Sequence, residues 1–140
     1  MGSTYYVDFP RARFIVMDTQ GLQLLRDYTV TLTWLKQAMQ TAGDRFVIVM
    51  MHHPVYSIAE GRFNPGIWLT FHRVLQRADV VFAGHDHSYA VRRHFINTTS
   101  SRKVYHTKRR TTVDAAANSR LYEIVEIQAD TLRVSTYSLD

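Results

Sequence analysis

Histidines gather in two short segments, each of which follows a hydrophobic run with the composition of a strand. Residues 52–54 read His-His-Pro and follow the run 46–51, and residues 84–87 read Gly-His-Asp-His and follow the run 80–83. Neutral imidazole is the commonest metal ligand in proteins and suits zinc, iron and other transition metals. These residue types indicate metal chemistry, provided that the fold brings the two segments together.

The order of the predicted elements places the two segments side by side. The runs 46–51 and 80–83 are rich in valine and other apolar residues, which is typical of strands buried on both faces. A short helix is predicted over 68–77, between them. A strand–helix–strand unit with parallel strands has a right-handed crossover, so both strands end at the same edge of the sheet. Ligand sites of α/β folds lie outside this carboxyl edge.

The rest of the chain is predicted to complete a mixed sheet with helices in a single domain. Before the first histidine segment we expect two strands (5–9 and 13–17) joined by a turn at Pro10, a polar loop over 19–29, and a helix with Thr29 or Thr31 as N-cap and Gly43 as C-cap. After the second segment, alternating apolar residues predict antiparallel strands over 89–96, 104–107, 121–127 and 132–137, with a hairpin turn over 128–131.

Composition excludes several classes of protein. The chain has 140 residues, of which 46% are hydrophobic and none is cysteine, so we expect one core, no disulfides and no thiolate metal site. No apolar run reaches the roughly 18 residues of a membrane span. Residues 1–3 look like an expression scar rather than a signal peptide. The formal net charge is +5, and the basic residues that crowd 92–110 fit either attraction of phosphate-bearing ligands or a solvated face, without a nucleic-acid-binding motif.

The metal site is incomplete in the sequence. Two metal ions about 3.5 to 4 Å apart repel each other and normally need a bridging carboxylate. The acidic residues before the first histidine segment are Asp8, Asp18, Asp27 and Asp44. Asp44 precedes its strand and is expected at the opposite edge of the sheet, and Asp18 is interpreted as a turn or supporting residue rather than a ligand.

The two histidine segments together resemble motifs of the calcineurin-like metallophosphoesterases. Residues 52–60, His-His-Pro-Val-Tyr-Ser-Ile-Ala-Glu, followed by 84–87 are similar to the purple (tartrate-resistant) acid phosphatase branch, with its His-x-Pro-Val-aromatic-Ser and Gly-His-x-His motifs. Residues 18–19 and 33–35 also match that branch, and the resemblance extends over about 5–92. It implies an α/β fold, the C-terminal half of a four-layer α-β-β-α sandwich, with a mixed sheet and helices on one face.

The resemblance also implies roles for single residues. His52 and His85 resemble ligands of one metal ion, and His87 resembles a ligand of the other, in an intact domain that holds two divalent or trivalent ions (Fe, Zn or Mn). The fragment by itself is expected to bind one ion or none. Residues expected to line the substrate pocket or to support the ligands are His53, Tyr56, Glu60 and Asp86. Gly61 stands where some relatives have a substrate-facing histidine.

The chain departs from the family in lacking its early motifs, which are Asp-x-Gly or Asp-x-His, Gly-Asp-x-x-Tyr or Asp, and Gly-Asn-His. These motifs supply the first Asp, the bridging Asp, an Asn ligand and the catalytic His, so no catalytic residue is assigned here. We expect residues 4–140 to be the C-terminal half of a catalytic domain, inactive or nearly so by itself. The implied function is metal-dependent hydrolysis of phosphate esters, and the resemblance favours a periplasmic or extracellular location.

Two other functions are compatible with the histidines. A non-catalytic metal- or phosphate-binding module would keep the ligands without chemistry. A cupin-like barrel would use His-x-His with a Glu and a further His, but no Glu follows His87 closely. Half of a sandwich should also expose an apolar sheet face, which favours a homo-oligomer. We expect a phosphate-ester substrate, and neither nucleic acid nor membrane as partner.

Overall fold

The computed structural model describes residues 3–25, 28–99, 105, 114–116 and 120–139. Its elements in chain order are β1 (Tyr5–Asp8), β2 (Ala12–Met17), α1 (Thr19–Leu25), α2 (Tyr28–Gln40), β3 (Phe46–Met51), α3 (Pro65–Leu75), β4 (Val80–Ala83), β5 (Tyr89–Arg92), β6 (Phe95–Asn97), β7 (Asp114–Ala116), β8 (Leu121–Gln128) and β9 (Thr131–Ser138).

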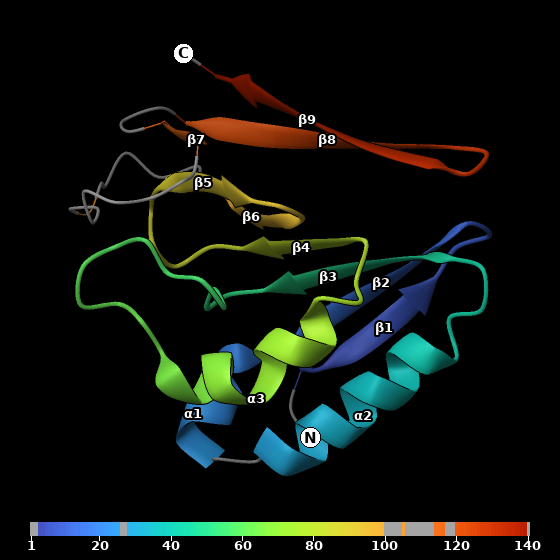
Figure 1. Ribbon diagram of the computed structural model, residues 1–140, viewed down its shortest axis with the longest axis horizontal. Coiled ribbons are helices and arrows are strands. Elements are labelled where there is room, and N and C mark those ends of the chain that lie inside the picture. The colour runs from blue at the N-terminus through green and yellow to red at the C-terminus, as the bar shows by residue number, and fades with distance from the viewer. Residues whose placement is uncertain (1–2, 26–27, 100–104, 106–113, 117–119, 140) are drawn as a thin grey trace.

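Seven of the strands form one mixed sheet in the order β1-β2-β3-β4-β6-β5-β7, and β8 and β9 form a separate antiparallel hairpin. The central neighbours β2, β3, β4 and β6 are parallel, whereas β1, β5 and β7 pair antiparallel. Figure 1 shows the helices on one side of this sheet and the β8–β9 hairpin on the other. The predicted α/β class, with a mixed sheet and helices on one face, is confirmed.

Alternating residues of the central strands build a core on each face of the sheet. On the helical face, Val47, Val49 and Met51 of β3 pack with buried residues of α2 and α3. On the other face, Ile48 belongs to a second cluster that side chains of β8 and β9 cover. Burial on both faces explains why the sequence of β3 is a continuous apolar run. None of the helices in the described part of the chain is long and apolar enough to cross a membrane.

Helix α3 is the crossover that makes β3 and β4 parallel neighbours. The Asn64 side chain caps its first turn by accepting a hydrogen bond from the Ile67 N–H at 3.1 Å, and Pro65 occupies the first turn. Ile67 and Phe71 are fully buried against the sheet. The helix therefore begins at Pro65, three residues before the predicted range 68–77, because its cap lies in the polar segment that precedes the apolar pattern.

The predicted polar loop over 19–29 is wrong. Asp18 accepts a hydrogen bond from the Gly21 N–H at 2.8 Å and caps α1, and Leu22 of this short helix is buried. Helix α2 then begins at Tyr28, so Thr29 and Thr31 lie inside it and are not its N-cap. A seven-residue helix has too few apolar positions to show a helical period in the sequence.

The ends of two further predicted elements also differ. Helix α2 ends at Gln40, and Gly43 adopts a φ of +65° in the turn that follows it. The single strand predicted over 89–96 is the hairpin of β5 and β6, because Arg93 takes a φ of +57° and reverses the chain. Of the predicted strand 104–107, only Tyr105 lies within the described residues.

Candidate metal centre

The register of the parallel strands brings three chain segments to one point. Met17 of β2 pairs with Met51 of β3, and Met51 pairs with Ala83 of β4, so the three strands end level with one another. The residues that follow each strand, 18–19, 52–53 and 84–85, therefore meet at the carboxyl edge of the sheet. This is the edge at which the sequence predicts a ligand site.

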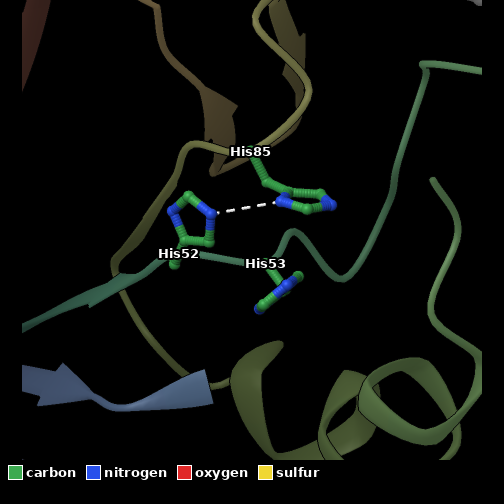
Figure 2. A group of neighbouring side chains, drawn as sticks. All are labelled: His52, His53 and His85. Carbon is green, nitrogen blue, oxygen red and sulfur yellow. Dashed lines mark hydrogen bonds between the residues drawn. The ribbon is translucent and has the colours of Figure 1, made fainter. Parts of the chain in front are cut away.

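Three imidazoles converge at this edge. His52, His53 and His85 each offer a ring nitrogen, and these nitrogens all lie within 4.8 Å of one another. Nε2 of His52 is 3.1 Å from Nδ1 of His85, and the rings of His53 and His85 are 4.3 Å apart between centroids. Figure 2 shows His53 beneath the pair formed by the other two rings. The structure thus brings His52 and His85 together as predicted, and His53 is the third member of the group.

Thr19 orients His53. The Thr19 hydroxyl oxygen accepts a hydrogen bond from the His53 backbone N–H at 3.0 Å and lies 3.0 Å from Nδ1 of the same ring. Both residues are buried. In the tautomer that donates from Nδ1 to Thr19, Nε2 of His53 keeps its lone pair for a metal ion, an arrangement common among ligating histidines. Sequence reasoning missed this partner, although Thr19 lies only two residues after the end of β2.

Asp86 holds the second histidine segment to the loop after β3. Its side chain is completely buried and accepts hydrogen bonds from the Ser57 hydroxyl at 3.0 Å and the Ile58 N–H at 2.7 Å. The flanking residues His85 and His87 have φ angles of +65° and +48°, which residues with a Cβ seldom adopt. Such a backbone persists only where its surroundings hold it, and Asp86 supplies that anchor. Asp86 therefore fixes the backbone that carries His85 and His87.

His87 lies outside the group of three. Its ring packs on Tyr105 with centroids 4.9 Å apart, and its buried Nδ1 has no hydrogen-bond partner among the described residues. Tyr56 is half-buried, contacts Phe95 edge-on at 4.9 Å and receives the Arg92 guanidinium over its ring at 4.3 Å. These contacts give Tyr56 a packing role. Glu60 is exposed on the same loop.

Arg62 is a second residue that sequence reasoning missed. Its Nη2 lies 3.3 Å from Nδ1 of His85, and its guanidinium carbon lies 4.3 Å from the centroid of the Tyr105 ring. It follows Gly61, whose φ of +69° turns the chain back toward the site. The only signal in the sequence was its place two residues after Glu60 in a recognised motif.

Burial and neighbouring positive charge keep two of the imidazoles neutral. Burial, followed by the proximity of His85 and His52, lowers the pKa of His53 to about 4. Burial, followed by the charge of Arg62, lowers the pKa of His85 to about 4. Both rings are therefore unprotonated at neutral pH, which is the form that binds a metal.

The donor set fits one transition-metal ion. Three neutral imidazoles are the ligands that zinc takes in sites that keep a fourth position open. Within the described residues no carboxylate belongs to this group. A pair of metal ions needs negative charge between them to offset their repulsion, so the three histidines alone do not fit two ions. The unpartnered Nδ1 of His87, two residues after His85 in the sequence, is a further donor.

Comparisons with known proteins identify a family and a fold. The family model described as calcineurin-like phosphoesterase matches residues 5–89, which include both histidine segments. A solved structure described as "GAP50 the anchor in the inner membrane complex of Plasmodium" is similar over 96% of this chain, with a TM-score of 0.71 and 18% identity. The present chain covers 49% of that chain, about half of its length. At this identity the likeness concerns the fold. No curated protein matches the chain.

Proposed function

Because the chain belongs to the calcineurin-like phosphoesterases, we propose that it forms part of a metal-dependent hydrolase of phosphate esters. The observation that carries this proposal is the convergence of His52, His53 and His85 at the ends of two adjacent parallel strands. A metal ion bound there would supply a water of lowered pKa and a positive charge for the phosphate oxygens.

The residues of this chain hold and orient the donors. His53 and His85 are kept neutral by burial, so they present lone pairs at neutral pH. Thr19 fixes the ring of His53, and Asp86 fixes the backbone that carries His85. Each of these supports is buried, so the donor geometry is set before any ligand arrives.

The finer assignment is to the purple acid phosphatase branch, with two metal ions in the intact domain. It rests on the motifs at 52–60 and 84–87 and is supported by the buried, unpartnered Nδ1 of His87, which suits a ligand of the second ion. The bridging carboxylate and the catalytic group would come from an N-terminal half of the same domain. The coverage of only half of the similar solved structure agrees with this division.

Metal binding and hydrolysis by the chain alone and by the complete domain test the proposal. We expect the chain alone to bind one Zn²⁺ by competition with a chromophoric chelator and to hydrolyse almost no p-nitrophenyl phosphate. The complete domain should bind two ions and hydrolyse the ester. His85→Ala should abolish zinc binding by the chain, whereas His72→Ala should not, because His72 stacks on Trp68 of α3 at 4.5 Å.

Two results would contradict the proposal. A complete domain that binds its metal ions but hydrolyses neither phosphomonoesters nor phosphodiesters would favour the non-catalytic binding module. A turnover by the chain alone equal to that of the complete domain would show that no further half is required.

A further inference from the structure

Arg62 places a fixed positive charge against the three imidazoles. A guanidinium only donates hydrogen bonds, so Nδ1 of His85, 3.3 Å from Nη2 of Arg62, is the acceptor in this contact. The same Nδ1 lies 3.1 Å from Nε2 of His52, which makes it the atom through which these two histidines would share a metal ion. A lone pair that accepts a hydrogen bond cannot coordinate at the same time, so Arg62 and a metal ion compete for His85.

The guanidinium also has an unused donor. Nε of Arg62 is buried and has no hydrogen-bond partner in the described part of the chain. A buried donor without a partner costs free energy, so this N–H calls for an acceptor, which a ligand oxygen can supply. The guanidinium carbon lies 4.3 Å from the centroid of the Tyr105 ring, and this cation–π contact holds the guanidinium beside the imidazoles.

Nε and Nη2 of an arginine form a planar fork that matches two oxygens of a carboxylate or phosphate. Arg13 shows this arrangement within the same chain, because its Nε and Nη2 bind the two carboxylate oxygens of Asp8 at 2.6 and 2.7 Å. Among the residues that the structure describes, the corresponding Nε of Arg62 is unpartnered, and Nη2 lies against the ring nitrogen of His85. The fork would become fully available if a metal ion took its place at His85.

We propose that Arg62 binds the phosphate group of the substrate and that it leaves His85 when a metal ion binds there. This inference rests on the proposed function of the same site and adds a substrate-binding residue to it. The contact between Arg62 and His85 then has two consequences. The guanidinium of Arg62 places its positive charge beside the imidazoles, where a metal ion would bind. It therefore weakens metal binding until the Arg62 side chain moves to the phosphate group.

Zinc affinity tests the competition. Arg62→Gln removes the charge and frees Nδ1 of His85, so the variant should bind Zn²⁺ about fivefold more tightly, because a positive charge beside the site repels the cation. Arg73→Gln is the matched control, because it lowers the net charge of the chain by the same amount as Arg62→Gln does. Arg73 is exposed on α3, so its replacement should leave zinc affinity unchanged. Equal zinc affinity of wild type and Arg62→Gln, or no zinc binding by either, would overturn the competition.

Phosphate affinity tests the substrate role. Inorganic phosphate is titrated by calorimetry into the chain with and without zinc, and Arg62→Gln should bind about tenfold more weakly than wild type, the loss expected for one charge-assisted contact. Arg62→Lys keeps the charge without the fork and should fall between them. A wild type that binds no phosphate, or an equal loss in Arg73→Gln, would overturn the role. Circular dichroism establishes that each variant is folded.

Neither measurement requires turnover, so the outcome is separate from that of the proposed function. If the complete domain proves inactive while Arg62→Gln still loses phosphate affinity, the hydrolase proposal fails and the phosphate contact stands. If the domain is active and Arg62→Gln binds phosphate as well as wild type does, the hydrolase proposal stands and the phosphate-binding role of Arg62 fails.

Discussion

Thr19 shows how a side chain outside the histidine segments can fix the orientation of a candidate ligand. Thr19→Val keeps the shape but removes the oxygen that accepts from the buried N–H of His53. We expect the free energy of unfolding to fall by about 1–3 kcal/mol, the cost of a buried donor without a partner. Zinc affinity should fall about tenfold, as is usual when the partner of a ligating histidine is lost.

Urea denaturation and chelator competition measure these two effects. Thr33→Val is the matched control, because the Thr33 hydroxyl donates a hydrogen bond to the Thr29 carbonyl on the exposed face of α2. A Thr19→Val protein with unchanged zinc affinity would show that the His53 ring is held by packing alone.

The stability of the metal-free protein should depend on pH through His53 and His85. Their pKa values lie near 4 in the folded chain, below the ordinary value of 6.5. Between these values the unfolded chain binds more protons, so the free energy of unfolding decreases as the pH falls from about 6.5 toward 4. Urea denaturation at pH 7 and pH 5 measures the decrease, and His53→Asn should make it smaller. Identical stability at both pH values would show that the rings are not kept neutral.

At the scale of the elements, α3 determines whether the two histidine segments meet. The cap of this helix is a single hydrogen bond from Ile67 N–H to the side chain of Asn64. Asn64→Ala should lower the free energy of unfolding by about 1 kcal/mol, the usual contribution of an N-cap, whereas Asn64→Asp keeps the acceptor and should stay close to wild type. Urea denaturation measures the free energy of unfolding of both variants. An equal decrease in Asn64→Ala and Asn64→Asp would mean that the cap contributes through its shape rather than its hydrogen bond.

The elements that the sequence predicted well are those whose pattern reflects burial. Strands β3 and β4 lie inside the sheet, so their continuous apolar runs identified them and the crossover rule fixed the edge at which their histidines lie. Helix α1 was missed, because a capped helix of seven residues leaves almost no periodic signal. The approach of Arg62 to His85 could not be predicted either, because it depends on the path of an irregular loop after Gly61.

At the scale of the whole molecule, the two faces of the seven-stranded sheet are covered unequally. Helices α1, α2 and α3 cover one face, whereas the other face is covered by the two-stranded β8–β9 hairpin (Figure 1). The hairpin directs Val125 and Ile127 toward the sheet and leaves Tyr122, Ile124 and Tyr137 exposed on its outer side. Exposed apolar side chains gathered on one face usually mark a contact surface.

This outer face of the hairpin leads us to expect that the chain by itself associates with a second copy. Tyr122 and Tyr137 stack with centroids 5.4 Å apart, and Ile124 beside them is 44% exposed. A charge in this surface would have to be desolvated in the interface, so Ile124→Lys should shift a dimer to a monomer. Light scattering at micromolar concentrations measures the mass. Leu69→Lys is the matched control, because Leu69 is 68% exposed on α3, on the opposite side of the sheet, and should leave the dimer intact. A wild-type chain that is monomeric throughout this range would show that the hairpin face does not bind a second copy.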